Sequence, residues 1–88
     1  MDQANIVIYK VNPLATPRIE IDTNEGKRYQ ADLSYLKTVP CFPKNQADWE
    51  NVSITAQGFN LTWGTRFEVH VDQIIDSADS VEELKLQA

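Results

Sequence analysis

The chain has 88 residues, of which 42% are hydrophobic and 24% are charged, and its formal net charge is −5. This composition is typical of one soluble globular domain and excludes a disordered chain. A single cysteine, Cys41, excludes an internal disulfide, and no apolar stretch has the length of a membrane-spanning helix or of a signal-peptide core. We therefore expect a cytoplasmic protein without membrane association.

The negative charge is concentrated near the C-terminus. Residues 67–88 carry six acidic side chains and one lysine, whereas residues 1–66 carry equal numbers of acids and bases. Binding to a phosphate backbone requires clustered lysine and arginine, so direct nucleic-acid binding is not expected. An acidic segment of this kind is typical of a solvated helical face, and it is also compatible with docking onto a basic protein partner.

The first half of the chain predicts three strands and two short helices. "NIVIYKV" over residues 5–11 is rich in β-branched and aromatic residues, and "RIEID" over residues 18–22 alternates between apolar and polar. A further strand over residues 29–33 follows the turn at Gly26, which makes a hairpin. Ser34 begins a helical turn that Pro40 ends, and Asn45 is expected to cap a helix over residues 46–51.

The second half returns to strand periodicity. Residues 52–56, 59–63 and 66–71 predict three strands, with Gly64 in the turn between the last two. The expected core side consists of Phe59, Leu61, Trp63, Phe67, Val69 and Val71. The fold class is therefore α+β: a small antiparallel sheet of five or six short strands built from hairpins, with two to four short helices.

The C-terminal segment allows two interpretations, and both are helical. Asp72 stands where an N-cap belongs, and Ser80 with Glu83 forms a capping-box pattern that would open a second short helix. Alternatively, one amphipathic helix continues through Val81 and Leu84. In either case the domain organisation is a single α+β domain over residues 1–76, followed by an acidic C-terminal helical tail over residues 77–88.

The order of these motifs resembles a bacterial family catalogued as domain of unknown function twenty-four forty-two. The resemblance covers residues 11–75 and rests on "NEGK", "ADLSYL", "LTWG" and "HVDQII", with the key positions Gly26, Asp32, Ser34, Tyr35, Leu36, Trp63, Gly64 and Asp72. It implies a small α+β domain, often encoded beside another small protein in a toxin–antitoxin-like arrangement. The family brings no established catalytic residues.

Reactive groups are too few to predict an enzyme or a cofactor. Cys41 and His70 form the one thiol dyad that the composition allows, yet Cys41 is flanked by prolines and has no adjacent base, so we interpret it as a structural cysteine. A metal site would have to use His70 with Glu68 and Asp72, which are spaced along one strand rather than drawn from several elements. We expect no metal ion and no cofactor.

The sequence thus predicts a non-enzymatic protein-interaction module, the acidic, antitoxin-like partner of a small basic protein. The alternatives are a structural homo-oligomer, in which an exposed strand such as residues 5–11 pairs in a homodimer, and a small-molecule or metal-binding protein centred on His70. The candidate interaction face consists of Arg66, Glu68, His70, Asp72, Asp76, Glu82 and Glu83.

Overall fold

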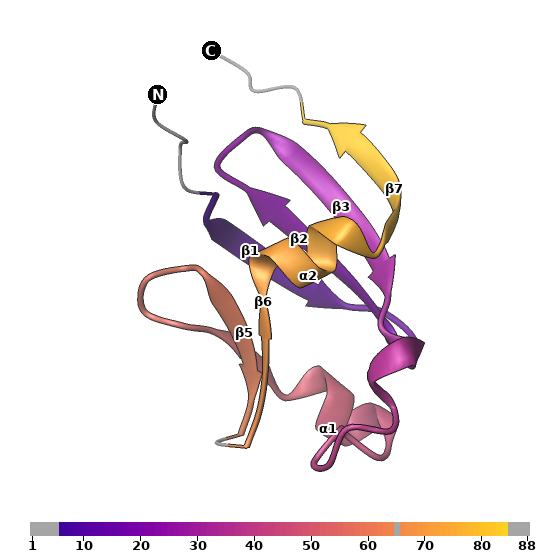
Figure 1. Cartoon of the computed structure of the whole chain (residues 1–88). Coiled ribbons are helices and arrows are strands. Elements are labelled where there is room, and N and C mark those ends of the chain that lie inside the picture. Colours follow the sequence, from indigo (N-terminus) through magenta and orange to yellow (C-terminus); the bar gives the residue numbers. More distant parts are fainter. Residues whose placement is uncertain (1–5, 65, 85–88) are drawn as a thin grey trace.

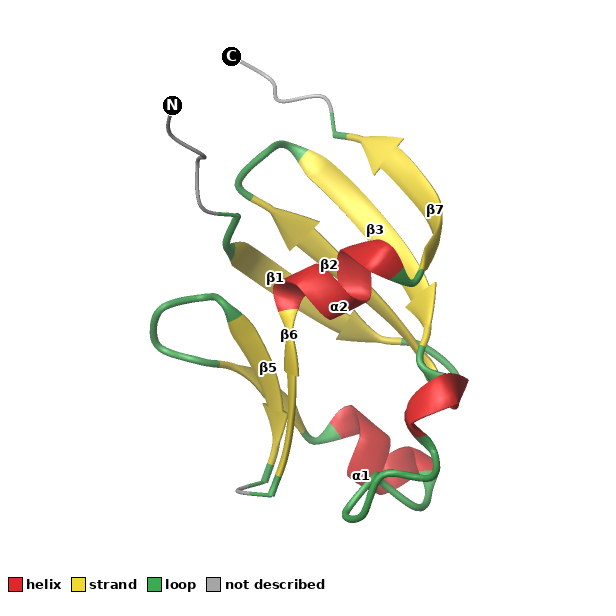
Figure 2. Cartoon of the chain, viewed as in Figure 1, coloured by secondary structure: helices red, strands yellow, loops and turns green. Residues whose placement is uncertain are grey.

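The computed structural model describes residues 6–64 and 66–84, and it contains seven strands and two α-helices there (Figures 1 and 2). The α+β class predicted from the sequence is confirmed. In chain order the elements are β1 (Ile8–Pro13), β2 (Arg18–Thr23), β3 (Lys27–Asp32), the 3₁₀ turn η1 (Ser34–Leu36), α1 (Gln46–Glu50), β4 (Val52–Ile54), β5 (Asn60–Trp63), β6 (Phe67–His70), α2 (Val71–Asp76) and β7 (Ala78–Glu83).

The strands form two antiparallel sheets, where the sequence predicted a single sheet. One sheet has the order β1-β2-β3-β7 and the other has the order β4-β5-β6. The segment between β3 and β4, which contains η1 and α1, separates the hairpins, so their apolar faces meet across a shared core. Period-two patterns identify the strands but do not specify which hairpins share a sheet.

The predicted β2–β3 hairpin is confirmed. Ile21 lies opposite Tyr29, and Gly26 occupies the turn with a φ of 77°. Ile19 and Ile21 are fully buried, while the alternating polar residues of β2 lie on the opposite face of the sheet. The alternation in "RIEID" therefore correctly predicts which side chains of this strand are buried and which face away from the core.

The predicted helical tail is wrong over the part that the structure describes. Helix α2 ends at Asp76, where the Ser77 hydroxyl hydrogen-bonds to the Gln73 carbonyl at 2.7 Å and to the Tyr35 hydroxyl at 2.9 Å. The next six residues form strand β7, which pairs antiparallel with β3. Pairing with β7 gives the backbone groups at the free side of β3 hydrogen-bond partners. The stability gained from this pairing outweighs the helix propensity of the capping-box pattern at residues 80–83. Residues 77–83 thus belong to the domain, and residues 85–88 lie outside the described part.

The core lies between the two sheets and is centred on Trp49 of α1. The Trp49 ring stacks on Trp63 at a centroid distance of 4.9 Å and on Phe42 at 5.7 Å. Its indole N–H donates to the Arg18 carbonyl at 2.9 Å, and the Trp63 indole N–H donates to the Trp49 carbonyl at 2.8 Å. Trp49 therefore links β2 of the first sheet to β5 of the second.

The expected core side of β5 and β6 is largely confirmed. Leu61, Trp63, Phe67, Val69 and Val71 are buried, and Phe59 is half-buried. Val71 lies in the first turn of α2 rather than at the end of a strand.

None of the helices formed by residues 6–64 and 66–84 combines the length and the apolar character that crossing a membrane requires.

Candidate functional site

The polar side of β6 is exposed, as the sequence predicts. Its side chains do not form one cluster. Glu68 accepts a hydrogen bond from the side-chain amide of Asn60, which lies on the neighbouring strand. Arg66 lies in the turn before β6 rather than on the strand, and it is exposed. The row of charges expected from the sequence is therefore interrupted: Glu68 is bound to Asn60 on the neighbouring strand, and Arg66 precedes the strand.

His70 is the N-cap of α2, a position that the sequence assigned to Asp72. The His70 Nδ1 accepts a hydrogen bond from the backbone N–H of Asp72 at 3.1 Å, and the Gln73 side chain accepts from the His70 N–H at 3.2 Å. Asp72 lies instead in the first turn, where the partial positive charge of the helix end favours a carboxylate. The prediction failed because asparagine, aspartate and serine are preferred over histidine at this position.

We expect His70→Ala to destabilise the domain by about 1 kcal/mol, the usual cost of removing an N-cap acceptor. His70→Asn should restore most of that stability, because its side-chain oxygen can accept the same N–H. Thermal unfolding of the three proteins followed by circular dichroism measures the difference. Equal midpoints for wild type and His70→Ala would contradict the capping role.

His70 and Cys41 are the residues on which the metal-binding and thiol-dyad hypotheses depend. Over residues 6–64 and 66–84, no group of three or more His, Cys, Asp or Glu side chains is placed to hold a metal ion. Cys41 is exposed with a φ of 71°, contrary to the packed structural role expected from the sequence. It borders two surface hollows of about 280 and 540 Å³, and His70 lines neither of them.

The acidic candidates divide between two consecutive elements. Asp72 and Asp76 are exposed on α2, and Glu82 and Glu83 are exposed on β7. Figure 1 shows α2 running across the four-stranded sheet from the end of β6 to the start of β7. The residues of the predicted interaction face are thus distributed over the turn before β6, β6, α2 and β7, and β7 lies at the edge of the sheet.

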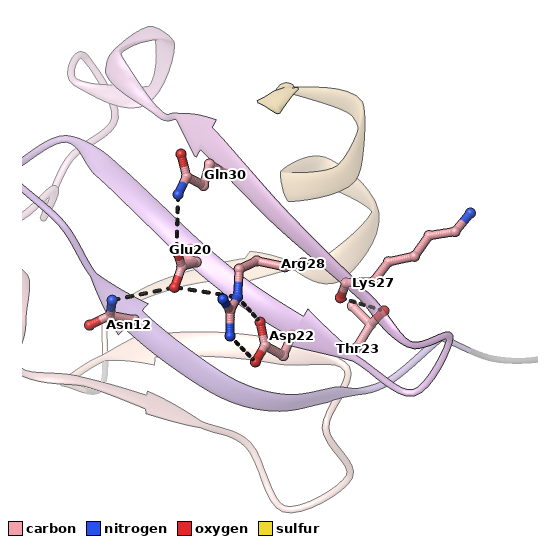
Figure 3. A network of polar contacts seen from close by, with 7 residues as sticks. All are labelled: Asn12, Glu20, Asp22, Thr23, Lys27, Arg28 and Gln30. Atoms are coloured by element: carbon pink, nitrogen blue, oxygen red, sulfur yellow. Dashed lines mark hydrogen bonds and ion pairs between the residues drawn. The ribbon is translucent and has the colours of Figure 1, made fainter. Parts of the chain in front are cut away.

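Most charges on the outer face of the four-stranded sheet compensate one another (Figure 3). The Arg28 guanidinium donates to both carboxylate oxygens of Asp22, at 2.7 and 3.0 Å, and lies 3.7 Å from Glu20. These contacts raise the pKa of Arg28 above its ordinary value, with the hydrogen bond to Asp22 as the largest cause. Glu20 also accepts from Gln30 at 2.9 Å. This face is polar but locally neutralised.

Asp79 makes a structural contact that the sequence does not reveal. The Arg18 guanidinium donates two hydrogen bonds to its carboxylate, at 2.8 and 2.9 Å, which ties the start of β7 to β2. Hydrogen bonding to Arg18 lowers the pKa of Asp79 below its ordinary value. No local pattern could link two residues so far apart in the chain, because the contact depends on β7 being a strand.

Glu82 and Glu83 are different from these paired carboxylates. No hydrogen bond or ion pair within the described part of the chain uses either side chain. Both are exposed, and they lie on opposite faces of the same edge strand because successive residues of a strand alternate. In the β3–β7 ladder Arg28 lies opposite Glu82 and Lys27 lies opposite Glu83, so each carboxylate has a basic residue on the neighbouring strand.

Comparison of the chain with models of known protein families, with curated proteins and with solved structures found no match.

Proposed function

We propose that this protein is a non-enzymatic interaction module and that it binds a small basic protein as an acidic, antitoxin-like partner in the cytoplasm. The observation that carries the proposal is the charge of residues 67–84, which include six acidic side chains and neither lysine nor arginine. All six are exposed, on β6, α2 and β7; Asp79 is paired with Arg18, Asp72 lies 3.6 Å from the His70 imidazole, and Glu82 lies opposite Arg28 in the β3–β7 ladder.

Charge of one sign on one side of a domain accelerates association with a partner of opposite charge and disfavours partners of the same charge. The paired network on the outer sheet face lacks this property, because its arginines and carboxylates already satisfy one another. The α2 and β7 segments contain exposed carboxylates and neither lysine nor arginine. The resemblance to the bacterial family named above points to the same kind of arrangement, a small protein that acts beside another.

Affinity capture from the host organism with the full chain as bait tests this function. We expect capture of a small basic protein, release of that protein at high salt, and formation of the same complex from the two purified components. The double variant Glu82→Gln/Glu83→Gln should retain less of the partner. The matched control is Asp48→Asn/Glu50→Gln, which removes two exposed charges from α1 and should retain the partner fully.

The proposal would be overturned by a captured partner that is itself acidic, or by a complex whose affinity does not change with salt. Equal loss of binding in the two double variants would also count against it, because the effect would then follow net charge rather than the position of the charge.

A further inference from the structure

The open edge of the four-stranded sheet is strand β7. Within the described residues β7 pairs with β3 alone, and Figure 1 shows it at the outer side of the sheet. The Leu84 N–H donates to the Gly26 carbonyl at 2.8 Å, so the backbone groups of Leu84 point toward the β3 side. Because these directions alternate along a strand, the N–H and C=O groups of Val81 and Glu83 point to the open edge.

The opposite edge of the same sheet, strand β1, is closed by three features. The Ile8 N–H donates to the Gly58 carbonyl at 2.7 Å, and the register is irregular between Ile8 and Lys10. Pro13 at the end of β1 has no N–H to offer. Gly58 approaches so closely that an added Cβ would lie 3.0 Å from the Cβ of Val7. Bulges, prolines and covering loops are the usual means by which sheet edges are protected, and β1 has all of them.

The β7 edge contains no proline. Its side chains determine which residues a strand that pairs with it should carry. Val81 is 56% exposed and offers an apolar contact. Glu82 and Glu83 offer one carboxylate on each face of the strand, between the basic residues Arg28 and Lys27 of β3 on one side and the open edge on the other. Pairing of β7 with a second copy of itself would bring four glutamates into one short ladder, which is unfavourable because like charges on adjacent strands repel. A basic extended segment avoids this repulsion.

We infer that β7 binds a basic, extended segment of the partner as a fifth antiparallel strand of the sheet, hydrogen-bonded to Val81 and Glu83. In this orientation the segment meets Glu83, Glu82 and Val81 in that order, so it carries two basic residues followed by an apolar one. Backbone hydrogen bonds supply affinity in such strand addition, and the side chains supply specificity. This inference rests on the proposed function and specifies how and where the partner binds.

A synthetic peptide tests the inference with the full chain and without the natural partner. The probe is an end-capped peptide, Ser-Lys-Lys-Val-Thr-Val-Ser, titrated into ¹⁵N-labelled protein at low salt. We expect shifts of the Val81 and Glu83 amide signals and slower hydrogen exchange at these two amides. Peptides in which both lysines are replaced by glutamate, or in which alternate backbone amides are N-methylated, should bind at least about tenfold more weakly.

Val81→Pro provides the matched test in the protein. It removes an N–H that points to the open edge and leaves the hydrogen bonds between β7 and β3 in place, whereas Val81→Ala keeps the N–H. We expect Val81→Pro to weaken peptide binding by about tenfold or more and Val81→Ala to weaken it less. Circular dichroism and the spectra of β1 to β3 verify that both variants are folded.

Two results would overturn the inference: absence of peptide binding, or equal binding of the N-methylated and unmodified peptides. In the second case the contact would be one of charge alone. If a basic partner is captured from the host but binds Val81→Pro as it binds wild type, the strand addition is wrong and the interaction module stands. If the peptide pairs with β7 but the host yields no basic partner, the proposed function fails and the peptide-binding edge stands.

Discussion

Trp49→Ala is expected to remove a large part of the free energy of unfolding of this domain. Trp49 is 0% exposed, and it contacts Phe42 and Trp63 with its ring and Arg18 with its indole N–H. Replacement of a buried tryptophan by alanine costs about 3–5 kcal/mol. A domain of this length has about 4–13 kcal/mol of total stability, so the loss removes a large part of it.

The cost has an additional source in the Arg18 carbonyl, which would lose its hydrogen-bond donor inside the core. Trp49→Phe separates the two effects, since it retains an aromatic ring and removes the N–H. We expect this variant to fold and to lose about 1–2 kcal/mol. Urea unfolding followed by far-ultraviolet circular dichroism gives the free energies, and Tyr9→Ala, at a side chain that is 67% exposed, is the control. A Trp49→Ala midpoint close to that of wild type would show that the core has been assigned wrongly.

A loss of stability between pH 10 and pH 12 is the second large effect that we expect, and it originates at Tyr29. Burial, followed by the hydrogen bond to the Glu25 carboxylate at 2.7 Å and its negative charge, raises the pKa of Tyr29 from 10.0 to about 12. The folded protein therefore retains the phenolic proton at pH values where the unfolded chain releases it. This contribution is fully present below pH 10 and is lost as the pH rises through the folded pKa.

The size of this contribution is on the order of 2–3 kcal/mol, because each unit of pKa difference corresponds to about 1.4 kcal/mol. Tyr29 is only 6% exposed, so solvent screening reduces the effect little. Urea unfolding at a series of pH values should show a steeper decline for wild type than for Tyr29→Phe, which has no proton to lose. Glu25→Gln should give an intermediate slope, since burial remains and the charge is removed. Parallel curves for wild type and Tyr29→Phe would refute this account.

The sequence predicts the elements of this fold better than it predicts their assembly. Alternation in "RIEID" and the position of Gly26 locate the β2–β3 hairpin. A strand with one buried face has apolar residues at every second position, and this alternation can be recognised in the sequence. The assembly into two sheets depends on Trp49 and its bonds to Arg18 and Trp63, which join residues far apart in the chain. Periodicity carries no information on such contacts.

In the candidate interaction face, too, some features follow from the local sequence and others depend on contacts between distant residues. Exposure of Glu68, His70 and Asp72 follows from their spacing, and the structure places all three at the surface. The strand at residues 78–83 was missed because its sequence favours a helix cap locally, whereas pairing with β3 decides its conformation. The roles of Glu82 and Glu83 at a sheet edge could be recognised only after that strand was known.

The placement of β7 in the sheet also governs when the protein can fold. Among the described elements, strands β1 to β3 are made before the β4-β5-β6 sheet and α2, and the fourth member of their sheet is made after them. While the chain is being synthesised, β3 therefore has an unfilled edge until residues 78–83 have left the ribosome. Any extended segment nearby could occupy that edge in the meantime, and completion of the sheet by the chain's own last strand ends this interval of exposure during synthesis.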